Sequence, residues 1–249
     1  MNQTICIAYQ PGAFGSFLAW ATERFSAVRK RYEPAVMDDP LLPDGSSHAY
    51  ASFCKIKTPD DFTQGLNTAR WDIKPWHTNV FAGWPGSDIN DAVTDIQTWM
   101  LAFDKLIMVE CEDADDHYLC YLRNESTMDR DRWYGMLDVS TDAQLIDALR
   151  KDINQPKLAQ SLKNDPRILA LTVKKILNWS PDQLGHALHT TLGWPTCDHQ
   201  LFRSVTADMQ SRQVQYLTRL SRIKNGSAST PAELAIQQSY LERKQNGSN

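Results

Sequence analysis

The sequence predicts an α/β fold of three layers, in which a parallel sheet carries helices on both faces, with a helix-rich C-terminal half. Three observations lead to this prediction. Apolar runs at 4–9 and 105–111 are short and bounded by turn residues, as in buried strands. Each run is followed by an amphipathic helical pattern, and strands that alternate with helices pair in parallel. Beyond residue 141, most of the remaining pattern is helical.

The N-terminal part contains the first expected strand–loop–helix unit. The strand "TICIAY" (4–9) leads through a short loop into "SFLAWATERFSAVRKRY" (16–32), whose aromatic residues recur at helical spacing. The proline-punctuated segment 33–52 is expected to be a surface loop. A second short strand is expected at 71–73, followed by a loop that contains His77.

The rest of the chain is expected to be mostly helical. The expected helices cover 88–103, 113–126, 141–153, 180–192, 198–223 and 231–245. The apolar run 165–177 fits either a strand or a helix. Ser180, Pro181 and Gln183 mark a helix start with a capping box. We expect one α/β domain over 1–224 and a C-terminal helical tail outside the core over 225–249.

Composition narrows the possible partners. The 249 residues carry a net charge of −4, which provides no general attraction to nucleic acid or anionic lipid. No apolar run approaches the roughly 20 residues of a membrane helix, and no basic leader precedes an apolar segment. The five cysteines include no Cys-x-x-Cys pair, as expected for reduced thiols. We therefore expect a soluble cytoplasmic protein without nucleic-acid or membrane partners.

The loop "QPGAFGS" between the first strand and the first helix has the composition of an anion-binding turn. Gly12 and Gly15 allow a tight turn, and the backbone amides from Gly12 through Ala13, Phe14 and Gly15 to Ser16 would face an anion at the helix start. The alternative is a tight connection in which the glycines relieve crowding and Ser16 caps the helix. No lysine precedes Ser16, so the complete Walker loop is absent and magnesium-dependent ATP hydrolysis is disfavoured.

The stretch "YQPGAFGSFLAW" resembles the 5′-phosphosulfate loop of sulfotransferases, which has a pattern like Y-P-K-S-G-T-[TS]-W-L. Pro11 falls on the family proline, Gly12 on its lysine, Ser16 on its second hydroxyl residue, Phe17 on its tryptophan and Leu18 on its leucine. The loop is also similar to lysine-free loops of divergent sulfotransferase-like proteins from phage and marine microbes. The resemblance implies a P-loop-type fold with 3′-phosphoadenosine-5′-phosphosulfate bound at Gly12–Ser16, and no metal.

The second motif of the family is matched only in part by "KLIMVECEDADDHYLCYL". Asp116 occupies the family aspartate position, which implies a cofactor-binding role. Glu112 stands where the arginine that binds the 3′-phosphate belongs, and Cys120 stands where a serine belongs; a carboxylate at this place repels phosphate. Three arginines could replace the missing cation, although each is expected to be an exposed charge: Arg123, Arg130 and Arg132.

His77 in "IKPWHTN" is similar to the histidine that serves cytosolic sulfotransferases as the catalytic base. The alternative is a histidine that packs among the neighbouring tryptophans. Other candidate sites are weaker: as metal ligands, His186 and His189 lack a third ligand nearby. The acidic stretch "EDADD" could hold magnesium but is typical of a solvated first helical turn. A Cys–His nucleophile would pair Cys111 or Cys120 with His117.

The resemblance implies transfer of a sulfuryl group from the nucleotide donor to a hydroxyl of an unknown small molecule or glycan. Two alternatives stay open. The chain could be a non-catalytic binding or assembly protein that retains the fold, since both expected cations are missing, or a divergent nucleotide kinase.

Overall fold

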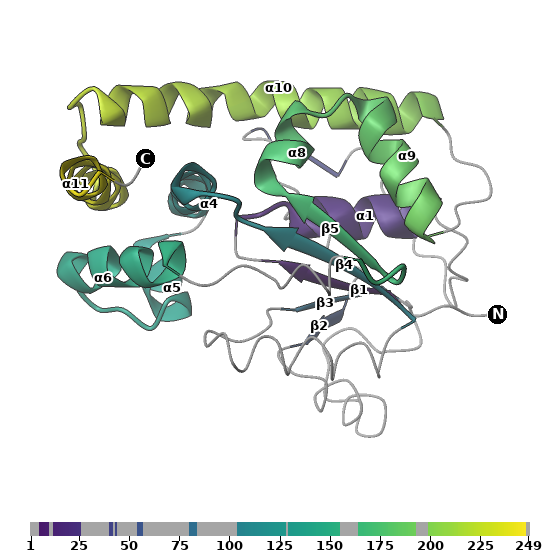
Figure 1. Cartoon of the computed structure of the whole chain (residues 1–249), viewed down its shortest axis with the longest axis horizontal. Helices are drawn as coiled ribbons and strands as arrows, with labels where there is room; N and C mark the ends of the chain where they lie inside the picture. The colour runs from purple at the N-terminus through teal and green to yellow at the C-terminus, as the bar shows by residue number, and fades with distance from the viewer. Residues whose placement is uncertain are drawn as a thin grey trace.

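The computed structural model describes ten stretches of the chain. They are residues 5–9, 12–25, 40–41, 43, 54–56, 80–83, 104–127, 129–154, 164–192 and 199–247. Within them, five parallel strands form one sheet in the order β2-β3-β1-β4-β5 (Figure 1). The strands are β1 (Ile5–Tyr9), β2 (Cys54–Ile56), β3 (Val80–Gly83), β4 (Lys105–Glu110) and β5 (Ile168–Thr172). The α/β class predicted from the sequence is confirmed.

The helices divide between the sheet and its carboxyl edge. They are α1 (Gly15–Phe25), α4 (Ala114–Thr127), α5 (Arg130–Met136), α6 (Asp142–Ile153), α8 (Val173–Asn178), α9 (Pro181–Leu192), α10 (His199–Lys224) and α11 (Pro231–Gln245). α1 contacts β1 and β3, and α9 contacts β5. Figure 1 shows α4, α5, α6 and α11 gathered beyond the carboxyl ends of the strands, with α10 running along both groups. None of the helices in the described stretches is long and apolar enough to cross a membrane.

β1 is the central strand. It pairs with β3 on one side, where Cys6 lies opposite Phe81, and with β4 on the other, where Cys6 lies opposite Leu106. Ile5, Cys6 and Ile7 are fully buried. A central strand of a parallel sheet is covered on both faces, which explains why its sequence is almost continuously apolar.

The chain leaves β1 and β4 in opposite directions. After β1 it proceeds to β2 on one edge of the sheet, and after β4 it proceeds to β5 on the other edge. Two adjacent parallel strands whose connections diverge leave a crevice at their carboxyl ends, and ligands of open α/β sheets bind in such crevices. The glycine loop after Tyr9 and the segment after Glu110 therefore meet at the topological switch point of the sheet.

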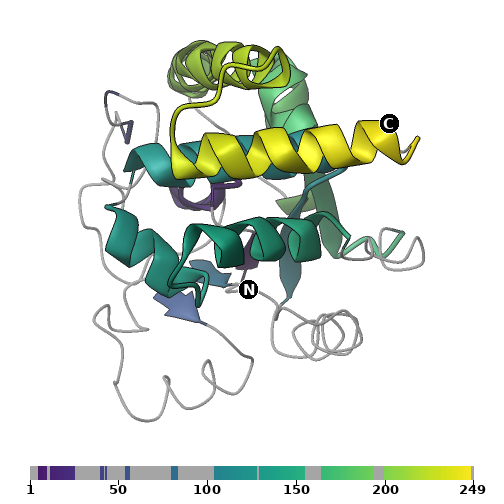
Figure 2. The ribbon, with the colours of Figure 1, turned by 90° about the vertical axis from the view of Figure 1, so that its left-hand side faces the viewer.

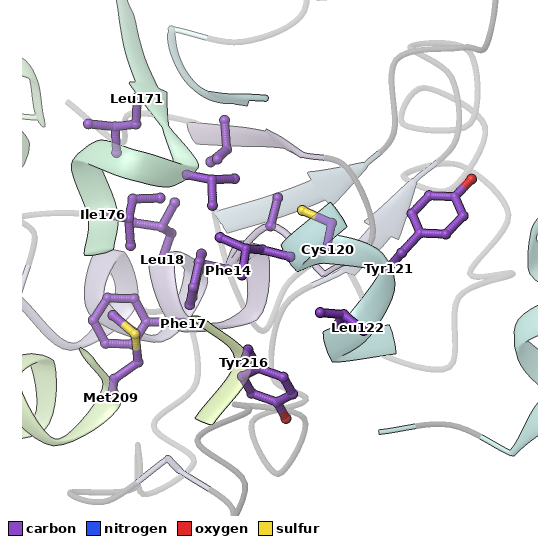
Figure 3. Packing of buried hydrophobic residues seen from close by; sticks show 14 of the residues in the cluster. Phe14, Phe17, Leu18, Cys120, Tyr121, Leu122, Leu171, Ile176, Met209 and Tyr216 are labelled. Carbon is purple, nitrogen blue, oxygen red and sulfur yellow. The ribbon is translucent and has the colours of Figure 1, made fainter. Parts of the chain in front are cut away.

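One hydrophobic core joins the helices to the sheet. Figure 3 shows Phe14 and Leu18 of the N-terminal unit and Cys120 of α4 among the members of this cluster. Aromatic rings connect α1 to α10: the centroids of Phe25 and Phe202 lie 5.5 Å apart in an edge-to-face arrangement. Such contacts are favourable beyond the area they bury.

The C-terminal segment is part of this core. The sequence predicts a tail outside the core over 225–249, but Ala232, Ala235 and Ile236 of α11 are all fully buried. Figure 2 shows α11 alongside α4 and α6, and the same pairs are in contact. Two of the three residues are alanines, whose small side chains let the helices approach closely without producing a strong apolar stripe in the sequence.

Most of the expected elements that lie in the described stretches are confirmed. The run 165–177 contains both alternatives, because β5 ends at Thr172 and that residue caps α8. The expected capping box of α9 is present, with Ser180 and Gln183 exchanging hydrogen bonds of 2.9 and 3.2 Å. β3 was not predicted, since 80–83 was assigned to a loop; it has only four residues, ends at Gly83 and is followed by Trp84 and Pro85. The expected elements at 71–73 and 88–103 lie outside the described residues.

Candidate functional site

The glycine loop packs directly against the backbone of α4. Gly12 has a φ of +86°, in the left-handed region, and a Cβ at this position would lie 2.5 Å from the carbonyl oxygen of Cys120. Only glycine satisfies both conditions without movement of the α4 backbone. Gly12 is thus required by the packing of the loop, as the crowding interpretation of the sequence expects.

Gly15, the first residue of α1, is covered by the ring of Tyr9. A Cβ on Gly15 would lie 2.2–2.3 Å from three atoms of this ring. Burial raises the pKa of Tyr9 to about 12, although a hydrogen bond with the Ser16 side chain acts in the opposite direction. The phenol is therefore neutral at physiological pH and is able to donate a hydrogen bond. Packing accounts for both glycines without a ligand.

Phe14 and Arg123 form a contact that the sequence did not reveal. Phe14 has a φ of +65°, which is rare for a bulky residue, and its side chain is only 4% exposed. The Arg123 guanidinium carbon lies 3.7 Å from the centre of the Phe14 ring, and Nη1 donates to the carbonyl oxygen of Gly12. The bond and the stacked ring hold the loop in its left-handed conformation.

Arg123 corrects an expectation from the sequence. It was predicted to be an exposed charge, but it is 7% exposed and contacts the loop. The reason is its position on α4: Asp116, Cys120 and Arg123 follow the i, i+4, i+7 spacing of one helical face. That spacing was the available signal. Arg130 is an exposed charge, as expected, paired with Asp142 at 2.7 Å; the Arg132 side chain lies outside the described part.

The start of α1 retains capacity for an anion. Leu18 donates its amide to the carbonyl oxygen of Phe14 at 3.0 Å. Among the described residues, no acceptor is bonded to the amides of Gly15, Ser16 or Phe17, which lie ahead of the first intrahelical bond. Unbonded amides at the positive end of the helix dipole favour an anion. Ala13, the remaining loop residue, has a fully buried side chain.

The start of α4 has no such capacity, because its own carboxylates use its amides. Asp113 accepts from the amides of Asp115 at 3.1 Å and Asp116 at 3.2 Å, and Asp116 accepts from the amide of Glu112 at 2.7 Å. Asp116 is therefore a capping residue. It is fully buried, and its Oδ1 atom has no partner among the described residues. Burial raises the pKa of Asp116 to about 6, although the bond from Glu112 opposes this shift.

The surrounding charges are mixed. Glu112 is exposed at the carboxyl end of β4, where it would repel a phosphate, as the sequence indicates. Lys174 at the start of α8 forms an ion pair with Asp113. Around the loop, Arg123 is thus the cation that the structure places in direct contact with Gly12 and Phe14.

The remaining candidate residues are histidines and possible metal ligands. His77, the expected base, lies outside the described residues. His186 and His189 are exposed on α9. Within the described stretches, no group of three or more histidine, cysteine or acidic side chains is arranged to hold a metal ion.

No profile of a known protein family matches the chain, and a search of curated proteins finds no similar sequence.

Proposed function

We propose that the chain is a sulfotransferase-like protein of the P-loop type, which binds the phosphate groups of a nucleotide-derived donor at the carboxyl ends of β1 and β4. One observation carries this proposal: the amides of Gly15, Ser16 and Phe17, to which no described residue supplies an acceptor, lie at the topological switch point of a parallel sheet. We also propose that helices cover both faces of the sheet, which makes three layers, and that the protein is cytoplasmic.

In this proposal the site holds its anion mainly through neutral donors. The amides of α1 bind the phosphate or sulfate oxygens, and the Tyr9 hydroxyl, which accepts from Ser16, donates beside them. Arg123 holds the loop through its hydrogen bond to the Gly12 carbonyl oxygen and adds positive charge beside it. In the sulfotransferase family, a lysine at the position of Gly12 supplies this charge. The donor is 3′-phosphoadenosine-5′-phosphosulfate, and His77 removes the proton of the hydroxyl acceptor.

A ligand panel tests the proposal. Adenosine 3′,5′-bisphosphate, ATP with magnesium, and sodium sulfate are added separately to the full chain, and the melting temperature is measured. A ligand at about 100 times its dissociation constant stabilises the folded state by about 2.7 kcal/mol, which is readily detected. We expect stabilisation by the bisphosphate without magnesium. Stabilisation by ATP with magnesium alone would identify a nucleotide kinase instead.

Two variants separate binding at the loop from general anion effects. Arg123→Met removes the cation behind the loop and should weaken bisphosphate binding about tenfold or more, since charge-assisted hydrogen bonds contribute about 1.5–3 kcal/mol. Arg203→Met removes an exposed arginine that pairs with Asp182 on α9, and should leave binding unchanged. Equal binding by both variants would exclude the loop as the site.

A second candidate is a non-catalytic binding or assembly protein. It is favoured by the packing contacts that account for Gly12 and Gly15 without a ligand, and by Glu112 at the carboxyl end of β4. This candidate predicts that none of the three ligands changes the melting temperature.

A further inference from the structure

Two cysteines meet at the carboxyl end of β4. Cys111 follows the strand and is partly exposed, whereas Cys120 lies in the second turn of α4 and is fully buried. Their sulfur atoms lie 3.9 Å apart, and neither cysteine forms a disulfide. We propose that Cys111 and Cys120 are a site of reversible disulfide formation, oxidised by a low-molecular-weight disulfide. This site is independent of the proposed function.

The two sulfur atoms are close enough for a disulfide to form after a small movement. A disulfide bond is about 2.05 Å long, so the sulfurs must approach by roughly 2 Å. Cys111 precedes the first turn of α4, where its backbone is not constrained by intrahelical hydrogen bonds. Rotation of its side chain and a small shift of this segment can supply the approach, while Cys120 stays in the helix.

The difference in exposure assigns an order to the two thiols. The Cys111 thiolate attacks one sulfur of the small disulfide, and a low-molecular-weight thiolate leaves. The Cys120 thiolate then attacks the Cys111 sulfur of the mixed disulfide, and the second small thiolate leaves. The protein loses two protons and two electrons, and the electrons reduce the small disulfide to two thiols.

The cross-link lies next to the glycine loop. The Cβ position of Gly12 is 2.5 Å from the carbonyl oxygen of Cys120 and 2.9 Å from its Cα atom. A change in the position of Cys120 is therefore transmitted to the loop by backbone contact. The disulfide would therefore tie the segment after β4 to the helix residue against which the glycine loop packs.

The reaction should be slow at neutral pH. The hydrogen bond with Cys120, burial, and the negative charges of Asp116 and Asp152 raise the pKa of Cys111 well above its usual value. The thiolate is the attacking species, so the rate should rise about tenfold for each pH unit between about 7 and 9.

The test incubates the reduced full chain with oxidised glutathione across this pH range and counts free thiols after denaturation. The chain has five cysteines, so the intact disulfide should leave three thiols and dithiothreitol should restore five. Peptide mapping should place the link between Cys111 and Cys120. Cys111→Ser substitutes the more exposed partner and should keep its four thiols, whereas Cys6→Ser, in the central strand, should still form the link. Five persistent thiols in the wild type, or a link that omits either cysteine, would overturn the proposal.

Discussion

Two buried carboxylates, one in the first turn of α4 and one in the first turn of α11, have opposite electrostatic environments. Asp116, at the carboxyl edge of the sheet, is fully buried and Glu233, in the first turn of α11, is 1% exposed. Burial raises the pKa of both groups. For Asp116 the result is a pKa of about 6, whereas hydrogen bonds from Arg219 and Ser229 and the charge of Arg219 lower the pKa of Glu233 to about 2.

The difference comes from the number and charge of the partners. Glu233 accepts from Arg219 at 2.5 Å, from Arg222 at 3.0 Å and from both the amide and the hydroxyl of Ser229 at 2.7 and 2.6 Å. Arg219 also pairs with Glu125 at 2.5 Å, so the network joins α4, α10 and α11. Burial alone therefore does not decide whether a carboxylate is stabilised.

The contrast extends to the surroundings of each group. Near Asp116 the structure contains an oxygen without a described partner, and Phe14 in a left-handed conformation. Glu233, in contrast, is paired with arginines and completes a capping box with Thr230. Strained and incompletely paired groups tend to gather where a protein functions, which supports the carboxyl edge of the sheet as the site.

The largest expected effect is the loss of the Glu233 network. Glu233→Gln should lower the free energy of unfolding by about 3 kcal/mol, because it leaves Arg219 and Arg222 without their shared buried anion. Urea denaturation at pH 7 measures the change. Leu234→Ala, at the next position, removes a half-exposed side chain and should change the stability by less than about 0.5 kcal/mol. Equal effects of both variants would contradict the assignment of stability to the network.

The next effect compares two glycines with similar backbone conformations. Gly12→Ala and Gly226→Ala both place a Cβ at a positive φ, +86° and +95°, which costs about 1 kcal/mol. At Gly226 the nearest atom is a flexible side-chain nitrogen 3.8 Å away, but at Gly12 the Cβ meets the α4 backbone at 2.5 Å. We therefore expect Gly12→Ala to lower the free energy of unfolding by about 1–3 kcal/mol more than Gly226→Ala does. Urea denaturation of both variants measures the difference. A difference near zero would show that the loop moves away from α4 easily.

The fold was predictable where its signals are local. The capping residues Thr141 and Ser180 stand beside the helices they start, so both helices were correctly placed. β3 was missed, because four residues provide too few positions for a periodic pattern. The place of α11 was also missed, since the burial of its alanines depends on partners in distant helices.

The site was predictable only in part, for the same reason. Gly12 and Gly15 stand out in the sequence as turn residues, but the groups that require them are the Cys120 carbonyl and the Tyr9 ring. The Arg123 bond to Gly12 spans 111 positions along the chain. Nothing near Arg123 in the sequence indicates that the helix turns this residue toward the loop, except its shared face with Asp116.

The pH dependence of stability should differ between the two carboxylates. The pKa of Asp116 is raised, so its contribution to stability is full below about pH 4 and is lost as the pH rises through about 6. The pKa of Glu233 is lowered, so its contribution is present above about pH 4.5 and is lost as the pH falls toward 2.

Asp116→Asn should remove the first of these dependences. Between pH 4 and 7 the wild-type stability should decrease by about 2 kcal/mol more than that of the variant, measured by urea denaturation at several pH values. Glu233→Gln is the control, because it should leave the slope in this upper range unchanged and flatten the slope below pH 4.5. If Asp116→Asn keeps the wild-type slope above pH 4, Asp116 is not the group that titrates near pH 6.

The smallest expected effect concerns an exposed ion pair on the same helix as Glu233. Glu242 on α11 accepts from Arg150 on α6 at 2.5 and 3.0 Å, in a two-bond geometry like that of a strong pair, but both side chains are 38% exposed. Water solvates these charges in the unfolded and the folded state alike. Glu242→Gln should therefore cost less than about 1 kcal/mol, and 1 M salt should reduce that cost further by screening. Glu233→Gln should keep most of its cost in the same salt, because the Glu233 carboxylate is shielded from solvent. Two substitutions of the same chemistry on one helix thus separate the effect of charge pairing from the effect of burial.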